Sequence, residues 1–307
     1  MKQLSISIAL ILFMAIGTFA GRPANPIWSP TGNHVAYEER PDDNTMADMK
    51  LLVIKKTNKL VKYTIRGGRK PVWSPRGDRI AFIQHRNGTD YVAMLYVQDG
   101  EIRIVCPGQD VAWFDYDRYL IIQRVDPMSY TTFVYRIRPD GREEKYLSEG
   151  ITPLPDPLGD FVVVSVRRDG KAALRIIDRN GAAIGTIKNA KWASWSSDGK
   201  SLTYTKSDTR AIYLWCFDKA ELASGNAEGI KISDDGCYSV FSHNGKMIAY
   251  SGSQKQGIYV YTISDTAIRR ISDNDVLASP RWAPDDSSLL IADPDTKELI
   301  FLPVTIQ

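Results

Sequence analysis

The sequence has few of the residues from which reactive or metal-binding sites are built. Its 307 residues include three cysteines, far apart, and three histidines. The cysteine spacing excludes a dense disulfide framework and the paired-cysteine pattern of zinc sites, but leaves open a bridge between Cys216 and Cys237 in an oxidising compartment. His34, His85 and His243 have unrelated surroundings. We therefore expect no catalytic triad, no metal site and no cofactor.

Charge of one sign and long apolar runs are also scarce. The chain has 39 Lys and Arg against 36 Asp and Glu, a formal net charge of +3. This balance provides no basic surface for nucleic acid, and none is expected as a partner. Beyond the first twenty residues no run approaches the roughly 20 apolar residues that cross a bilayer, so we expect no transmembrane segment in the mature chain. Helical periodicity of useful length is missing as well, which favours an all-β fold.

The N-terminal segment has a different character. Lys2 supplies a positive start, "ISIALILFMAIG" is apolar, and the segment ends in Thr18-Phe19-Ala20, with small residues at the usual cleavage positions. We predict a signal peptide over residues 1–20 and an exported protein in the periplasm or at the cell surface. An uncleaved N-terminal anchor is the alternative. Residues 21–307 are expected to form a single domain.

The sequence does contain a repeat, in which an aromatic residue, a small residue, a tight turn and an alternating apolar strand follow one another. Five copies are clear: "NPIWSPTGNHVAYEER", "KPVWSPRGDRIAFIQH", "WASWSSDGKSLTYTKS", "YSVFSHNGKMIAYSGS" and "SPRWAPDDSSLLIADP". Two are weaker: "DVAWFDYDRYLIIQRV" and "ITPLPDPLGDFVVVSV". The anchors of the copies are Trp28, Trp73, Trp113, Leu154, Trp195, Phe241 and Trp282. They lie roughly 40 to 46 residues apart, the period of a propeller blade.

Each unit reads locally as a small antiparallel sheet. In the second unit an inner strand ends at Trp73, and "RIAFIQ", "YVAMLYV" and "EIRIV" follow, with the hairpin dipeptide Asp99-Gly100 before the last strand. We predict a β-propeller of about seven four-stranded blades, whose aromatic anchors fill the wedge between neighbouring sheets. Six regular blades plus an irregular one is the alternative. For the last blade we expect three strands, because few residues follow "LIFLP"; retention of the apolar N-terminal segment in the fold is a further alternative.

The serine after the tryptophan has an architectural interpretation. Ser29 and Ser74 occupy equivalent positions in two copies, whereas a catalytic serine is needed once and requires a matching histidine. At the start of a turn a hydroxyl bonds a nearby backbone N–H. We expect both serines to do this.

The segments Trp73 to Phe82 and Trp28 to Tyr37 share the pattern Trp-Ser-Pro-x-Gly-(Asp/Asn)-x-(Ile/Val)-Ala-(Phe/Tyr). This pattern resembles the repeat of TolB-type β-propellers, over roughly residues 22 to 307, and also occurs in tricorn-like and prolyl-oligopeptidase-like propellers. The resemblance implies a periplasmic or cell-surface propeller that acts through protein or ligand contacts. We expect a counterpart of neither the N-terminal domain of TolB nor a hydrolase domain. A specific Tol role and peptidase activity are therefore not expected.

A function is expected at one mouth of the propeller channel, where the loops entering the inner strands meet. The candidate residues are Arg66, Arg69, Lys70, Lys191 and Arg281, near Asp110, together with Met128 and Tyr130 on a loop of the same face. We expect a monomeric, non-catalytic propeller that binds a protein partner or ligand in the cell envelope. The alternatives are a lyase or glycan-processing enzyme with its site at the channel mouth, and a sensor or structural subunit of an envelope complex.

Overall fold

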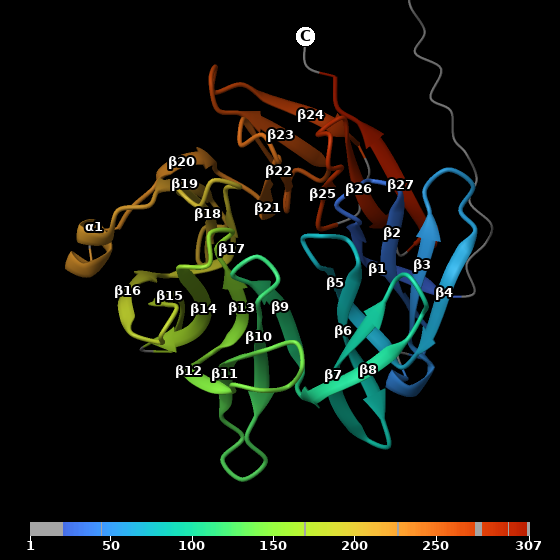
Figure 1. Cartoon of the computed structure of the whole chain (residues 1–307). Coiled ribbons are helices and arrows are strands. Elements are labelled where there is room, and N and C mark those ends of the chain that lie inside the picture. Colours follow the sequence, from blue (N-terminus) through green and yellow to red (C-terminus); the bar gives the residue numbers. More distant parts are fainter. Residues whose placement is uncertain are drawn as a thin grey trace, which may run out of the picture.

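The structure, a computed structural model, describes residues 21–43, 45–168, 170–225, 227–273, 278–293 and 295–305. Within these residues seven antiparallel sheets stand around a common axis as the blades of a β-propeller (Figure 1). The predicted all-β fold is confirmed. The predicted signal peptide, residues 1–20, lies outside the described residues.

The strands follow one another from the channel outward in each blade. Blade 1 contains β1 (Arg22–Trp28), β2 (His34–Arg40), β3 (Lys50–Lys55) and β4 (Val61–Arg66), with the 3-10 helix η1 (Met46–Asp48) before β3. Blade 2 contains β5 (Gly68–Trp73), β6 (Arg79–Arg86), β7 (Thr89–Tyr96) and β8 (Ile102–Pro107). Blade 3 contains β9 (Asp110–Phe114), β10 (Tyr119–Val125), β11 (Thr132–Ile137) and β12 (Lys145–Glu149). Blade 4 contains β13 (Ile151–Pro155), β14 (Phe161–Arg168), β15 (Lys171–Asp178) and β16 (Ala183–Lys188).

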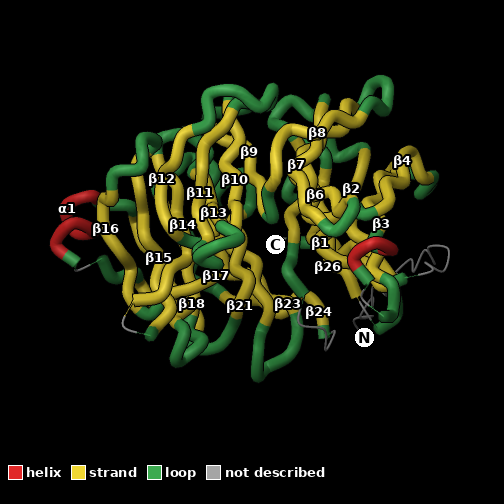
Figure 2. Tube along the Cα trace, turned by 90° about the horizontal axis from the view of Figure 1, so that it is seen from below, coloured by secondary structure: helices red, strands yellow, loops and turns green. Residues whose placement is uncertain are grey.

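The second half of the ring is built in the same way. Blade 5 contains β17 (Ala190–Trp195), β18 (Ser201–Lys206), β19 (Ile212–Cys216) and β20 (Ile230–Ser233). Blade 6 contains β21 (Cys237–Phe241), β22 (Met247–Ser251), β23 (Ile258–Thr262) and β24 (Ile268–Ser272). Blade 7 contains β25 (Arg281–Trp282), β26 (Ser288–Asp293) and β27 (Glu298–Pro303). Helix α1 (Lys219–Ser224) lies at the outer edge, between β19 and β20 in the chain (Figure 2).

The hydrophobic core lies between the blades. Strand β6 is buried over the five residues from Ile80 to Gln84, because neighbouring blades cover both faces of its sheet. The outermost strand β24 has only one covered face and is mostly exposed. One core cluster joins Val53 of blade 1 to Phe82 of blade 2, and another joins Tyr37 of blade 1 to Leu290 of blade 7. Five further clusters join the remaining pairs of neighbouring blades, so the cores form a closed circle.

Ring closure depends on packing between blades 1 and 7. Among the described residues the last sheet has three strands, as we expected, and the first sheet keeps its own four. The rings of Trp28 and Phe301 meet edge to face, with centroids 5.4 Å apart. Burial of apolar surface therefore holds the first blade to the last.

The aromatic anchors lie at the ends of the inner strands. Trp28, Trp73, Trp195, Phe241 and Trp282 are buried and Trp113 is partly buried. In three blades the indole Nε1 donates a hydrogen bond to a carbonyl of the preceding blade: Trp113 to Val72 at 3.1 Å, Trp195 to Leu154 at 3.3 Å and Trp282 to Val240 at 3.2 Å. These bonds add direction to the packing between blades.

The anchor expected in the fourth blade is wrong by one residue. Pro155 pairs with Val162, as Trp73 pairs with Ile80, so Pro155 and not Leu154 occupies the anchor position. The misalignment arose because this copy has no aromatic residue to mark the position. Leu154 instead supplies the carbonyl that accepts from Trp195.

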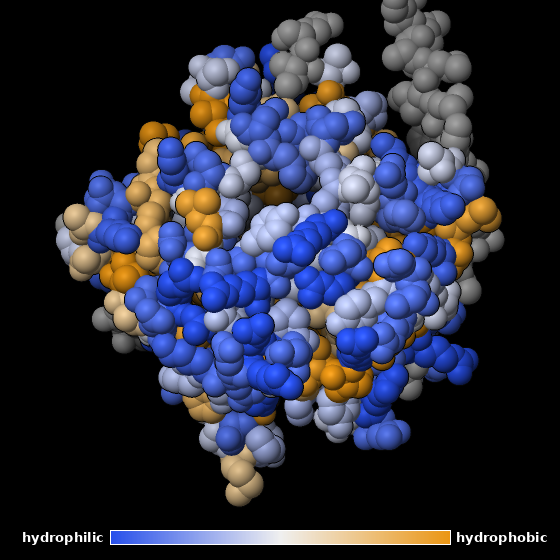
Figure 3. Space-filling model, viewed as in Figure 1, coloured by the Kyte–Doolittle hydropathy of each residue, from blue (hydrophilic) through white to orange (hydrophobic). Residues whose placement is uncertain are grey.

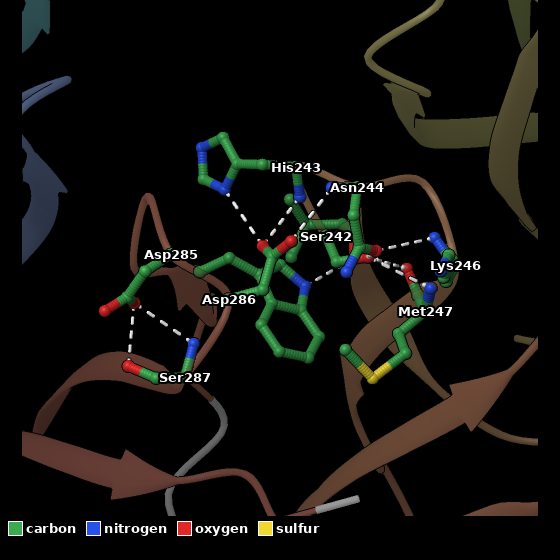
Figure 4. A network of polar contacts seen from close by, with 10 residues as sticks. Ser242, His243, Asn244, Lys246, Met247, Asp285, Asp286 and Ser287 are labelled. Atoms are coloured by element: carbon green, nitrogen blue, oxygen red, sulfur yellow. Dashed lines mark hydrogen bonds and ion pairs between the residues drawn. The ribbon is translucent and has the colours of Figure 1, made fainter.

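The serines after the anchors stabilise turns, as predicted. Ser29 Oγ accepts from the backbone N–H of His34 at 3.0 Å, and Ser74 Oγ accepts from that of Arg79 at 3.1 Å. Figure 4 shows the equivalent turn of blade 6, in which Ser242 Oγ accepts from Met247 N–H at 3.0 Å. Asp286 of blade 7 reaches this turn and accepts from the N–H of His243. The repeated motif therefore builds turns and links them between blades.

Candidate functional site at the channel mouth

The residues three positions before the anchors surround one mouth of the channel, where the chain enters each inner strand. We call them the mouth ring: Asn25, Lys70, Asp110, Thr152, Trp192, Tyr238 and Ser279. In five blades the ladder between the two innermost strands shifts register at this point. Such a bulge turns a side chain away from the regular alternation of the strand. Side chains turned in this way contribute to the mouth ring.

Five members of the mouth ring have an unusual backbone. Asn25, Lys70, Thr152, Trp192 and Tyr238 have φ values of 47°, 49°, 49°, 49° and 54°. Positive φ is costly for a β-branched or bulky side chain and persists where the surrounding structure holds it. Here a neighbouring blade supplies part of that support. Gln123 Oε1 accepts from the N–H of Thr152 at 2.8 Å.

A cavity of about 340 Å³ opens at this mouth. The inner strands of blades 4, 5 and 6 form most of its lining, strands β14 and β15 of blade 4 add to it, and Asp110 of blade 3 and Ser279 and Arg281 of blade 7 complete the wall. Its volume lies at the lower end of the range for ligand sites. Figure 3 shows a largely hydrophilic face with a hollow near its middle.

Two aromatic residues form one side of the cavity. The rings of Trp192 and Tyr238 lie with centroids 4.8 Å apart and an interplanar angle of 42°. Trp192 is 38% exposed, and the ammonium of Lys191 lies 3.8 Å from its ring centroid. This cation–π contact places the ammonium over the face of the indole. Partial burial raises the pKa of Tyr238, which keeps its phenol neutral.

Arg281 brings a charge into the cavity. Its Nε is buried and has no hydrogen-bond partner, and among the described residues its guanidinium forms no ion pair. Burial lowers the pKa of this group, although arginine stays charged. The residue is thus a cation held in the channel wall without a counter-ion in the part of the chain that the structure describes.

The other predicted cations do not gather as free charges at the mouth. Lys70 Nζ lies 2.9 Å from Asp110 Oδ2, and Arg69 is buried against Asp90 at 2.6 Å. Arg66 is exposed at the end of the outermost strand β4, away from the cavity wall. The expected cluster is therefore divided into two ion pairs, an exposed arginine, and the residues Lys191 and Arg281 near the cavity.

The loop between β10 and β11 extends from the edge of the propeller (Figure 1). Met128 and Tyr130 on it are 89% and 83% exposed. Asp126 Oδ1 accepts from the N–H groups of Met128 and Ser129, at 2.9 and 2.8 Å. These two bonds lower the pKa of Asp126, that from Ser129 most. The loop is an ordered turn that presents two large side chains to solvent.

Residues with catalytic or metal-binding chemistry lie apart. His85 contacts Asp90 at 2.9 Å in blade 2, His243 contacts Asp286 at 3.1 Å, and His34 packs near the ring of Trp73. In the described ranges no three His, Cys, Asp or Glu side chains come together as a metal site would require. Cys106, Cys216 and Cys237 are free thiols, so the bridge left open between the last two is not formed.

Sequence reasoning missed Trp192 and Tyr238. Both stand at the start of repeat copies, three positions before an anchor, where the other copies have Asn, Lys, Asp, Thr and Ser. Large aromatic residues at an otherwise small or polar position could have marked them. Their meeting could not have been predicted, because it requires blades 5 and 6 to stand side by side.

Comparisons with known proteins agree on the fold. No family model matches the chain, and no curated protein sequence matches it. Among solved structures, the propeller domain of Cps50 (Swd1) from Myceliophteria thermophila aligns with a TM-score of 0.72 and 15% identity, over 94% of this chain and 98% of that one. An oligogalacturonate lyase in complex with manganese aligns with a TM-score of 0.69 and 12% identity, over 94% of this chain and 89% of that one. At such identities the likeness establishes the propeller alone.

TolB is a weaker match. TolB from Acinetobacter baumannii aligns with a TM-score of 0.48 and 16% identity, over 94% of this chain and 65% of that one. A score this low carries no argument for a TolB-type protein. No helix within the described residues is long and apolar enough to span a membrane.

Proposed function

We propose that this chain is an exported, non-catalytic propeller of the cell envelope that binds a protein partner at the channel mouth. The observation that carries the proposal is the cavity between Trp192, Tyr238 and Arg281. Tryptophan, tyrosine and arginine are the residues that most often dominate binding at protein interfaces. The bulged inner strands hold the two aromatic rings in place, which lowers the entropic cost of association.

The cavity is better suited to binding than to catalysis. Among the described residues that line it, Asp110 is the one carboxylate, and Lys70 already holds it. No histidine lines the cavity. General acid–base chemistry needs a group free to accept or donate a proton at the reacting atom. A lyase or glycan-processing activity therefore has less support than binding.

The proposed binding surface includes the exposed loop between β10 and β11. Met128 and Tyr130 lie on a loop that connects the two middle strands of blade 3, which by topology belongs to the mouth face. A folded partner at the mouth would reach them.

We also propose that residues 1–20 are a signal peptide and that the repeat is of the TolB type. Mass spectrometry of the protein from the envelope fraction tests the first point, with Gly21 as the expected N-terminal residue.

Site-specific photo-cross-linking tests the binding surface. A photoreactive phenylalanine analogue replaces Tyr238 in one variant and Tyr116 in the control. Tyr116 is a suitable match because it is 59% exposed, has a positive φ of 64° and lies on a turn of the opposite face. We expect a discrete cross-linked protein from position 238 and none from position 116. Equal products from both positions, or no product from position 238, would contradict the proposal.

A further inference from the structure

We propose that the channel-mouth cavity recognises a chain end of its partner, with a free carboxylate on Arg281 and an apolar side chain against Leu154 and Ala193. This inference rests on the proposed function and adds the chemistry of the ligand. It is carried by the position of Arg281, by the apolar wall beside it and by the size of the cavity.

Arg281 is exceptional among its equivalents. The residues directly before the other blade anchors are Ile27, Val72, Ala112, Leu154, Ser194 and Val240. All six are uncharged, so the architecture of the inner strand does not require a cation here. The Nε of Arg281 is buried without a partner among the described residues, while the side chain as a whole is partly exposed. Burial of such a group costs stability. A ligand that supplies the missing anion would offset this cost on binding.

The charges of the cavity favour a carboxylate over a phosphate. Within the described part of the chain, the lining residues provide one cation, Arg281, and one anion, Asp110. A carboxylate carries a single negative charge and matches the planar fork of a guanidinium with two parallel hydrogen bonds. Because Lys70 already pairs with Asp110, Arg281 is left to balance the ligand, and a phosphate dianion carries one negative charge more than Arg281 can balance.

Apolar residues share the cavity wall with Arg281. Leu154 of blade 4 and Ala193 of blade 5, both partly exposed, belong to this wall. Val163 and Leu174 are each 1% exposed and belong to the core between blades 4 and 5, so they offer a ligand almost no surface. Hydroxyl groups placed against Leu154 and Ala193 would lose their hydrogen bonds to water, which disfavours a sugar at this part of the wall. A leucine-like side chain would gain by burial.

The size of the cavity favours the end of a polypeptide chain as the ligand. About 340 Å³ admits a short peptide segment and no folded element. The carboxylate and the apolar side chain must then come from one residue or from two adjacent residues. A C-terminal residue supplies both groups at once.

Short synthetic peptides test the inference with the purified full chain. The probes are N-acetyl-Ala-Ala-Leu with a free carboxylate, the same peptide as its C-terminal amide, and the amidated peptide N-acetyl-Leu-Glu-Ala. Glucuronate serves as an acidic sugar. Binding is followed by chemical-shift changes of the tryptophan indole N–H signals. We expect the free acid to bind about tenfold or more tightly than the amide, the loss that removal of a charge-assisted hydrogen bond produces.

Two variants assign the effect to Arg281. Arg281→Met keeps the length of the side chain and removes the unpaired charge, so we expect about tenfold weaker binding of the free acid together with an unchanged or higher Tm. Arg86→Met is the matched control. Arg86 is exposed at the end of β6 on the same face, and its removal changes the net charge equally. Arg86→Met should leave the affinity for the free-acid peptide unchanged.

The outcomes separate this inference from the proposed function. Equal binding of acid and amide, an unchanged affinity in Arg281→Met, or a lower Tm in that variant would overturn it. Tighter binding of the internal glutamate peptide would overturn the inference and indicate that the ligand is a loop of the partner. Glucuronate binding that depends on Arg281 would also overturn it and indicate that the ligand is an acidic sugar. If position 238 still cross-links a protein in any of these cases, the proposed function stands and the inference alone fails.

Discussion

Replacing anchor tryptophans by phenylalanine tests whether the indole N–H ties neighbouring blades together. Trp282 and Trp73 are a matched pair, 3% and 7% exposed. Trp282 Nε1 donates to the carbonyl of Val240 at 3.2 Å. Trp73 Nε1 is buried and has no acceptor among the described residues. The same substitution therefore removes a hydrogen bond at one site and an unsatisfied donor at the other.

The two sites should differ in the free energy of unfolding. Each substitution loses part of a buried ring, a cost of about 1 kcal/mol. At Trp282 the carbonyl of Val240 also loses its donor, which adds about 1 to 3 kcal/mol for an unsatisfied buried acceptor. At Trp73 the removed N–H was itself unsatisfied, so no such term arises. We expect Trp282→Phe to be the more destabilising by about 2 kcal/mol.

Equilibrium denaturation in urea, followed by circular dichroism, measures the difference. Trp195→Phe and Trp28→Phe provide a second pair, because Trp195 Nε1 donates to Leu154 and Trp28 Nε1 has no acceptor. Trp195 should behave like Trp282, and Trp28 like Trp73. Equal losses in all four variants would refute the reasoning and leave ring packing as the sole role of the anchors.

Three further predictions follow from the turns, the exposed loop and the thiols. Ser74→Ala should lower the free energy of unfolding by about 1 kcal/mol, because Ser74 Oγ accepts from Arg79 N–H. Cross-linking at the mouth should be unchanged. Complete loss of binding by a folded variant would restore a catalytic or ligand role for the serine. The pKa of Asp126 is lowered by the N–H groups of Ser129 and Met128, so the order of its loop should be retained above about pH 4 and lost as pH falls through the folded-state pKa. The amide shifts of these two residues report it, and a transition at or above the usual aspartate pKa would contradict it. Burial raises the pKa values of Cys106 and Cys237 to about 11. Maleimide at neutral pH should therefore modify the exposed Cys216 first. Faster labelling of Cys237 would contradict this order and show that its surroundings open.

The repeat in the sequence was sufficient to predict the fold. Aromatic anchors, turn residues and alternating strands recur at a blade-like period, and each acts over a short stretch of chain. The strands of the second blade and the turn role of Ser74 follow from such local signals. The one misplaced anchor, Leu154 for Pro155, lies in the copy where the aromatic signal is missing.

The candidate site depended on contacts between blades. Trp192 and Tyr238 belong to different repeats, and only the closed ring brings their side chains together. The pairing of Lys70 with Asp110 joins blades 2 and 3, which turns a predicted free cation into half of an ion pair. Local sequence thus determined the repeating unit, because turns and strands form from adjacent residues. The tertiary structure alone decided which charges are paired and which side chains line the cavity, because those depend on residues that meet only when the seven blades close.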